Sequence, residues 1–155
     1  MVTVSIPGWG DLSLEYLVVD FNGTAAFDGA LIQDVIEPLT TLSSHVKVII
    51  VTADTYGTVE KLIADGKVSV EITKVETGQD KADLVRELGP EHVAAIGNGA
   101  NDALMLREAA LGIGVIGQEG CAAALLKEAD VVVADIVDAL ELIQYPKRLV
   151  ATLRD

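Results

Sequence analysis

The sequence predicts an α/β domain built on a doubly wound, mostly parallel, Rossmann-like sheet. Short apolar runs alternate with amphipathic stretches, and no repeat, low-complexity tract or linker interrupts them. Strands that alternate with helices imply crossover connections, and therefore a parallel sheet covered on both faces. The runs Leu17–Val19 and Val48–Val51 are apolar at every position. Continuous apolar runs of this kind are typical of strands that are buried on both faces.

Taken in order, the chain begins with a predicted β-hairpin. Its first residues pair with the segment from Leu12 onward, and Pro7, Gly8 and Gly10 form the turn. The apolar runs predict strands at Thr3–Ile6, Leu14–Asp20, Val46–Thr52, Val68–Ile72, Val93–Ile96, Gly112–Ile116 and Val131–Val133.

Helices are expected between these strands, where apolar residues recur at helical spacing. One runs from Leu31 to Leu39, and Pro38 within it predicts that it is kinked or shorter than the pattern suggests. A later helix ends at Gly89 and Pro90. The apolar residues that define the other two helices are Val59, Leu62 and Ile63, and Leu84, Val85 and Leu88.

Length and charge exclude several classes of protein. The chain has 155 residues, about one ordinary domain, and its formal net charge is −13. Such a charge repels nucleic acid phosphates and anionic membranes. No apolar run is long enough to span a bilayer, no secretion signal precedes the first strand, and Cys121 is the single cysteine. We therefore expect a cytoplasmic protein that binds neither nucleic acid nor membrane.

Polar residues follow the buried runs at the edge where parallel strands present their carboxyl ends, which is where such sheets bind ligands. They stand at Asp20–Thr24, Thr52–Asp54 and Gly97–Asp102, and Lys81 opens the helix before the last of these strands. Singly, each has an ordinary structural explanation: Asp20 caps a helix, Thr52 bonds to nearby backbone, Lys81 is solvated. Jointly, two carboxylates, a hydroxyl, an ammonium and amides suit a phosphoryl group with Mg²⁺.

These motifs resemble the haloacid dehalogenase-like phosphatase superfamily over most of the chain, from Leu14 to Val133. Within it the chain looks most like small soluble relatives of the phosphorylation domain of P-type ATPases. Residues 6–8 (Ile-Pro-Gly), 20–24 (Asp-Phe-Asn-Gly-Thr) and 129–133 (Ala-Asp-Val-Val-Val) carry that likeness.

The resemblance implies a mechanism and a metal. Asp20 would attack phosphorus and form an aspartyl phosphate that water then hydrolyses. Mg²⁺ would be held by Asp20, the backbone carbonyl of Asn22, Asn98 and Asp102. Thr52 would donate to the phosphoryl group, and Lys81 would neutralise its charge. The implied substrate-binding residues are Phe21, Gly23, Ala53 and Asn101.

Two positions depart from the family pattern. Typical phosphatases carry Asp where this chain has Asn22, and that Asp serves as general acid and base. The family also supplies a metal-binding Asp where this chain has Asn98. We therefore expect a phosphohydrolase that favours good leaving groups. The alternative is a weak or inactive phosphate- or metal-binding module that acts through a partner protein. A receiver domain fits less well, because its phosphorylated Asp follows an acidic pair on an earlier strand.

The resemblance also bears on domain organisation. Many members insert a cap domain, but the intervals from Thr24 to Thr52 and from Thr52 to Lys81 are filled by expected core elements. Residues 1–155 are therefore expected to form a single core domain without a cap, with an open site. Such a site takes a small phosphorylated substrate or a phosphoprotein, or uses a second copy of the chain as its lid, in a homo-oligomer.

Overall fold

The computed structural model of the chain describes residues 1–53 and 70–155. Within these ranges the central sheet has six strands in the order β10-β9-β8-β3-β6-β7, and every neighbouring pair is parallel. This confirms the predicted doubly wound, parallel α/β fold. The strands are β3 (Tyr16–Asp20), β6 (Lys47–Thr52), β7 (Glu71–Lys74), β8 (Val93–Gly97), β9 (Leu111–Val115) and β10 (Val131–Val133).

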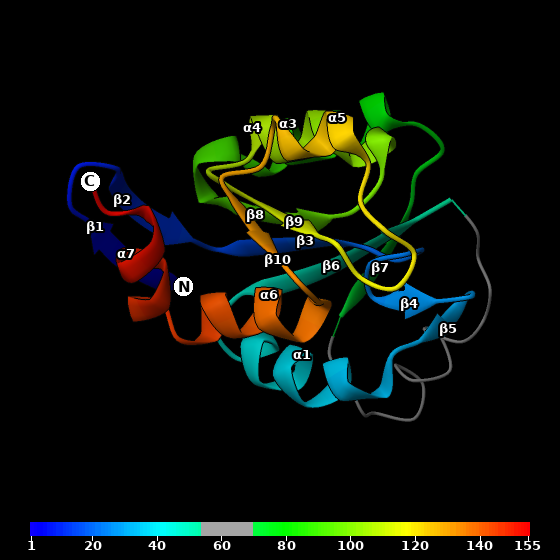
Figure 1. The fold of residues 1–155 in the computed structure, drawn as a ribbon, viewed down its shortest axis with the longest axis horizontal. Helices are drawn as coiled ribbons and strands as arrows, with labels where there is room; N and C mark the ends of the chain where they lie inside the picture. The colour runs from blue at the N-terminus through cyan, green and yellow to red at the C-terminus, as the bar shows by residue number, and fades with distance from the viewer. Residues whose placement is uncertain (54–69) are drawn as a thin grey trace.

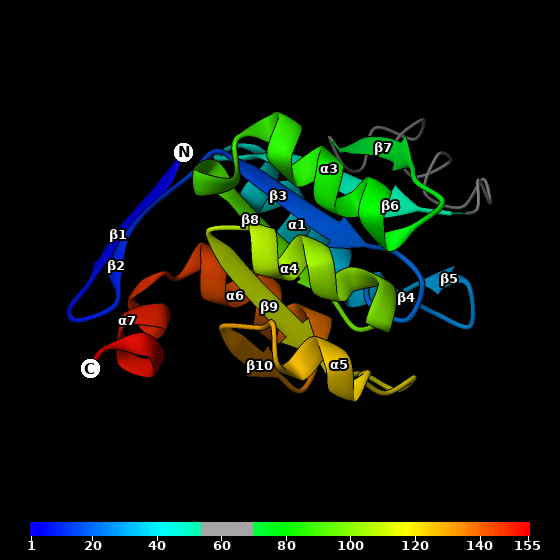
Figure 2. The ribbon, with the colours of Figure 1, turned by 90° about the horizontal axis from the view of Figure 1, so that it is seen from above.

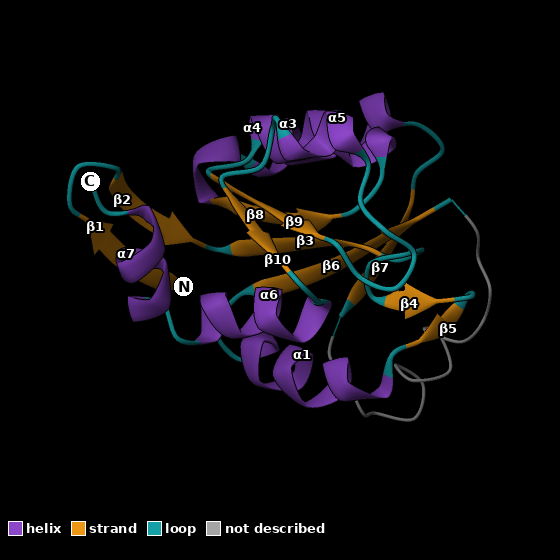
Figure 3. Cartoon of the chain, in the orientation of Figure 1, coloured by secondary structure: helices purple, strands orange, loops and turns teal. Residues whose placement is uncertain are grey.

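Helices cover both faces of this sheet, as Figures 1 and 3 show. One face carries α3 (Gly78–Leu88), α4 (Ala103–Glu108) and α5 (Ala123–Leu126), and the other carries α1 (Ile36–Ser43) and α6 (Ile136–Gln144). The central strand β3 contributes to both cores, because Val18 belongs to one apolar cluster while Leu17 and Val19 belong to the other. No helix in the described ranges is long and apolar enough to cross a membrane.

The predicted N-terminal hairpin is confirmed. Strands β1 (Val2–Ile6) and β2 (Gly10–Leu14) pair antiparallel, with Val2 opposite Leu14 and Ile6 opposite Gly10. The hairpin extends away from the sheet, and the C-terminal helix α7 (Lys147–Leu153) lies beside it, as Figure 2 shows from above. Both chain termini therefore lie at the end of the molecule remote from the carboxyl ends of the strands.

Two local predictions differ from the structure. The strand expected at Leu14–Asp20 is split at Glu15, whose N–H donates to the carbonyl of His92 as the chain passes from the hairpin into the sheet. Leu31 lies in a second hairpin, β4 (Ala26–Phe27) with β5 (Ala30–Leu31), so α1 starts only at Ile36. Pro38 stands in the first turn of α1, where a missing N–H costs nothing, so the late start of the helix follows from the β4–β5 hairpin and not from Pro38.

The strand expected from Val68 is seen as β7, which begins at Glu71. Val68 itself and the helix expected around Val59, Leu62 and Ile63 lie outside the described residues. Helix α6 was not predicted, although its buried residues recur at helical spacing: Ile136, Ala139, Leu140 and Ile143.

Candidate active site

The central strand β3 ends at Asp20, a residue that is 5% exposed. Its backbone lies between β6 and β8, opposite Val51 on β6. The two carboxylate oxygens have different partners: Oδ1 accepts from the Lys81 ammonium at 2.7 Å, and Oδ2 accepts from the Thr24 hydroxyl at 3.2 Å. The carboxylate is therefore fixed in orientation at the carboxyl edge of the sheet, where this fold binds ligands.

Helix α3 brings Lys81 to the same point. A capping box at its start, between Thr77 and Asp80, satisfies the first backbone N–H groups and fixes where the helix begins. Gly78 lets the helix approach the neighbouring loop, since a Cβ there would lie 2.7 Å from the carbonyl oxygen of Asn101. This close approach places the Lys81 ammonium, from a side chain only 4% exposed, between two carboxylates.

The second carboxylate is Asp102, which is fully buried in the loop after β8. Its Oδ1 accepts from Lys81 Nζ at 2.6 Å, and its Oδ2 accepts from the backbone N–H groups of Asn98 and Gly99 at 3.0 and 2.9 Å. Gly97 is needed beside it, because a Cβ there would lie 2.5 Å from the Cβ of Asp102. Asp20, Lys81 and Asp102 thus form a buried triad with one positive and two negative charges.

Burial and the charges of the triad shift the pKa values of Asp20 and Lys81. Burial, and then repulsion from Asp102, raise the pKa of Asp20 from 3.8 to about 6, although Lys81 and Thr24 act in the opposite direction. Burial lowers the pKa of Lys81, but the two carboxylates outweigh burial, so its pKa is raised overall and the ammonium stays charged. The excess of negative charge is characteristic of a site that binds a cation or transfers a charged group.

The raised pKa of Asp20, caused by burial and then by Asp102, predicts that the metal-free protein loses stability as pH rises. Because the pKa of Asp20 is higher in the folded state, about 6 against 3.8, the folded chain binds more protons between these values. The penalty is absent below them and complete above about pH 6, at up to about 3 kcal/mol. Urea unfolding in a chelator at about pH 5 and about pH 8 measures the part of this loss that falls between these pH values, about 1.4 kcal/mol.

Asp20→Asn should remove that part of the pH dependence, whereas Asp11→Asn, which changes an exposed carboxylate of β2, should retain it. Equal pH slopes for wild type and Asp20→Asn would show that Asp20 ionises as easily in the folded chain as in the unfolded one.

The other residues expected at the site lie around the triad. Thr52 is buried at the end of β6, and Ala53, Asn22 and Asn101 are exposed at the same edge. Phe21 and Gly23, which were expected to bind substrate, make contacts within the protein. The Phe21 ring is buried in the core and its N–H donates to the Val51 carbonyl, while the Gly23 N–H donates to the Ala26 carbonyl. These two hydrogen bonds hold the loop that follows Asp20 in place.

Sequence reasoning missed two participants, Thr24 and Gly120. The buried Thr24 hydroxyl lies 3.2 Å from Asp20 Oδ2 and 3.1 Å from Asn98 Oδ1. The Asn98 amide in turn donates from Nδ2 to the carbonyl of Gly120 at 3.0 Å. The sequence does carry a signal for Thr24, since it closes the polar run that begins at Asp20, but nothing in the sequence connects Gly120 to that run.

The oxygen donors at this edge fit a hard divalent cation such as Mg²⁺. Asp20 and Asp102 supply two buried carboxylates whose joint charge one ammonium leaves unbalanced, and Asn22 adds a backbone carbonyl two residues after Asp20. No cluster of three or more His, Cys, Asp or Glu side chains suited to a metal occurs in the described part of the chain. The donors named here are oxygen atoms, whereas soft metals prefer sulfur, so a soft metal is a poor match for this donor set.

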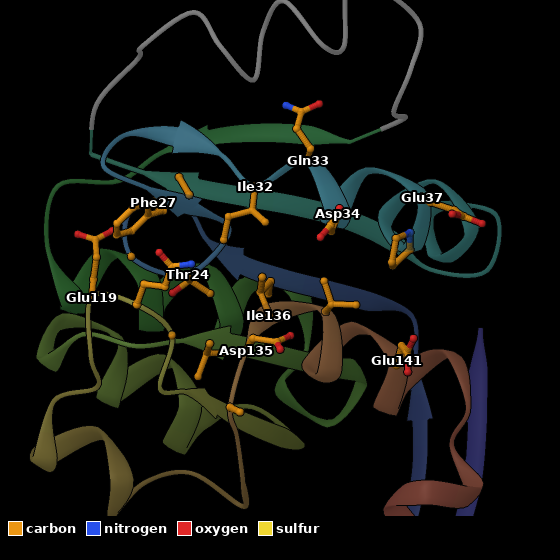
Figure 4. A pocket seen from close by; sticks show the side chains of 18 of the residues that line it. Thr24, Phe27, Ile32, Gln33, Asp34, Glu37, Glu119, Asp135, Ile136 and Glu141 are labelled. Atoms are coloured by element: carbon orange, nitrogen blue, oxygen red, sulfur yellow. The ribbon is translucent and has the colours of Figure 1, made fainter.

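A cavity of ≈ 940 Å³ lies beside this edge, between α1, α6 and the β4–β5 hairpin. Figure 4 shows Thr24 on its wall, with Phe27 and Glu119 on one side and Asp135 and Ile136 below. The cavity contacts the loop that follows Asp20 through Gly23 and Thr24.

Comparison with known proteins is consistent with this geometry. Residues 7–110 match the family model for haloacid dehalogenase-like hydrolases. An uncharacterized protein of Methanocaldococcus jannaschii is 48% identical over 73 residues, which cover 47% of this chain and 78% of that protein. The phospholipid-transporting ATPase dnf2 of Schizosaccharomyces pombe is 48% identical over 46 residues, 30% of this chain but only 3% of the ATPase.

A solved structure shares the fold at low sequence identity. The 3-deoxy-D-manno-octulosonate 8-phosphate phosphatase of Moraxella catarrhalis, in complex with a magnesium ion, a phosphate ion and a KDO molecule, has a TM-score of 0.68 and 21% identity. The match covers 91% of this chain and 94% of that one. At this identity the likeness concerns the fold.

Proposed function

This chain belongs to the haloacid dehalogenase-like hydrolase family, and on that premise we propose that it is a Mg²⁺-dependent phosphohydrolase with Asp20 as its nucleophile. The observation that carries the proposal is the buried triad in which Lys81 bridges Asp20 and Asp102 at 2.7 and 2.6 Å. A carboxylate held by a lysine at the carboxyl edge of a parallel sheet combines a nucleophile with the positive charge that phosphoryl transfer requires.

The proposed reaction has two displacements. A carboxylate oxygen of Asp20 bonds to phosphorus as the bond from phosphorus to the leaving oxygen breaks. This gives an aspartyl phosphate and an alkoxide, phenolate or carboxylate, and an alkoxide takes its proton from water. Water then attacks the phosphorus of this acyl phosphate, the Asp20 carboxylate departs, and inorganic phosphate is released. Lys81 neutralises charge on the phosphoryl oxygens throughout, and Thr52, Ala53 and Asn101 orient them.

Mg²⁺ would be held by Asp20, Asp102 and the backbone carbonyl of Asn22. When bound, it supplies positive charge against the phosphoryl oxygens and so reduces repulsion between substrate and carboxylates. The magnesium and phosphate ions in the Moraxella phosphatase, which has the same fold, support this assignment. We further propose a small phosphorylated substrate or a phosphoprotein, taken up by a single core domain that has no cap and associates with further copies.

Asn22 predicts the choice of leaving group. Its amide cannot give a proton to a departing alkoxide. Proton transfer from a general acid is typically worth about 10²–10⁴ in rate. Phosphate release should therefore be measurable with acetyl phosphate and p-nitrophenyl phosphate, and weaker by about 10²-fold or more with an alkyl phosphate. The measurement is Mg²⁺-dependent phosphate release from these three compounds, at equal concentration, by wild type and Asn22→Asp.

Asn22→Asp should narrow the difference in rate between the alkyl phosphate and the other two compounds, because it supplies the missing general acid. Gln118→Glu serves as the control, since it adds the same charge at an exposed position of the cavity beside this edge without standing two residues after the nucleophile. Equal rates with alkyl and aryl phosphates in wild type would contradict the role given to Asn22.

Asn22 and Asn98 together favour a second candidate, a phosphate- or metal-binding module that works through a partner protein. Both positions hold amides where typical family phosphatases hold carboxylates, so this chain has less charge for metal binding and no general acid. Absence of Mg²⁺-dependent turnover with all three compounds, together with phosphate binding by the folded chain, would favour this candidate over the enzyme.

A further inference from the structure

Asn98 stands where the family's metal-binding carboxylate is expected, yet its side chain is engaged elsewhere. Its Nδ2 donates to the carbonyl of Gly120 at 3.0 Å, and its Oδ1 lies 3.1 Å from the Thr24 hydroxyl. The backbone of Asn98 is bound as well: its N–H donates to Asp102 Oδ2, and its carbonyl accepts from Ala122 N–H at 2.8 Å. Asn98 therefore joins the loops that contain Thr24, Asp102 and Gly120.

The contact on the Gly120 side fixes which way the amide points. A carbonyl oxygen accepts hydrogen bonds only, so the NH₂ group must face Gly120 and the amide oxygen must face Thr24. The fit is close, because a Cβ on Gly23 would lie 2.6 Å from Asn98 Nδ2, and Gly23 has φ of +78°. The loop that follows Asp20 thus packs directly on the Asn98 amide.

Thr24 transmits this orientation to the nucleophile. Its hydroxyl has one proton and faces two acceptors, the carboxylate oxygen Oδ2 of Asp20 and the amide oxygen of Asn98. A charged acceptor attracts the proton more strongly than a neutral one, so the hydroxyl favours Asp20 while that carboxylate is free. When Asp20 is protonated or phosphorylated, the amide oxygen remains as a partner for the hydroxyl of Thr24, a residue that is 1% exposed.

From this arrangement we propose that Asn98 is a positioning residue, which orients the Asp20 carboxylate through the Thr24 hydroxyl and requires an amide to do so. This inference rests on the proposed function for the identity of the nucleophile. An Asp at this position would face the Gly120 carbonyl without a proton to donate, and its charge would compete with Asp20 for the Thr24 proton. The amide is thus a requirement of this site, and the loss of a metal-binding carboxylate is its consequence.

The first test measures stability in the absence of metal. Urea unfolding in a chelator is compared for wild type, Thr24→Val, Asn98→Ala and the double variant. Each single change should lower the unfolding midpoint, and the double variant should lose less than the two single losses combined, because both remove one linked network. Asn101→Ala changes an exposed amide of the same loop and should leave the midpoint unaltered.

The second test separates positioning from packing. With p-nitrophenyl phosphate at saturating Mg²⁺, Asn98→Ala and Thr24→Val should each lower kcat by about 10–100-fold with little change in KM. Thr24→Ser retains the hydroxyl and should restore most of kcat. Asn98→Asp should lower both kcat and the metal-free unfolding midpoint, since the amide and not the oxygen alone is required.

Two results would overturn the inference. One is additive stability losses for Thr24→Val and Asn98→Ala. The other is an Asn98→Asp variant that needs less Mg²⁺ and keeps its kcat and metal-free stability, as a metal-ligand role for position 98 predicts. If wild type shows no turnover, the proposed function fails, and the metal-free stability cycle still decides whether the Thr24–Asn98 link exists.

Discussion

Asp20→Asn should abolish Mg²⁺-dependent phosphate release and leave a folded protein. The amide that replaces the carboxylate cannot form an acyl phosphate, so the rate should fall on the order of 10⁴-fold or more, as when other enzymes lose a covalent nucleophile. The fold should persist because the change keeps the shape of the side chain and removes a negative charge that is unfavourable there, since burial and then repulsion from Asp102 raise the pKa of Asp20. The measurement is phosphate release from acetyl phosphate and p-nitrophenyl phosphate, with circular dichroism as the check on folding.

Asp11→Asn is the matched control, because it makes the same chemical change on the N-terminal hairpin, far from the carboxyl edge of the sheet. Its rate should equal that of wild type. A direct readout is also available: wild type incubated with acetyl phosphate and quenched in acid should carry a phosphoryl group on Asp20 that hydroxylamine removes. Wild-type rates in the Asp20→Asn variant would eliminate the aspartyl phosphate mechanism.

The convergence of the triad is predictable from a general rule about parallel sheets. Asp20 and the loop before Asp102 each end a continuous apolar run, and the carboxyl ends of such strands meet at one edge. Lys81 joins them because it opens the helix that precedes β8. The amino-acid pattern therefore associates residues as far apart as Asp20 and Asp102, and the two lie within hydrogen-bond distance of one ammonium.

The direction of individual side chains is not predictable in the same way. Whether the Asn98 amide turns toward a metal or toward Thr24 depends on the Gly120 carbonyl, which a different loop supplies. The β4–β5 hairpin does have a local signal: Asp28 and Gly29, both with positive φ, form the two-residue turn that an Asp-Gly pair favours. That hairpin replaces the first turns of the predicted helix, since a tight turn at Gly29 returns Leu31 to pair with Ala26.

The charge balance of the triad leads to the second large effect, on stability. Lys81→Met should lower the free energy of unfolding of the metal-free protein by about 3–5 kcal/mol at neutral pH, the usual cost of leaving buried charge without its partner. The cost is high here because one ammonium serves two carboxylates, Asp20 at 5% and Asp102 at 0% exposure. Urea unfolding in a chelator measures it, and Lys127→Met, at an exposed lysine, should cost little.

Adding Asp20→Asn to Lys81→Met tests whether charge causes that loss. If it does, the second change should recover a large part of the stability, because it leaves Asp102 as the only carboxylate of the triad, with backbone N–H donors from Asn98 and Gly99. Mg²⁺ should also stabilise Lys81→Met more than it stabilises wild type, since a cation then replaces the missing ammonium. If Lys81→Met were no less stable than Lys127→Met, Lys81 would not be the charge that holds the two carboxylates together, and the electrostatic basis of the proposed site would be wrong.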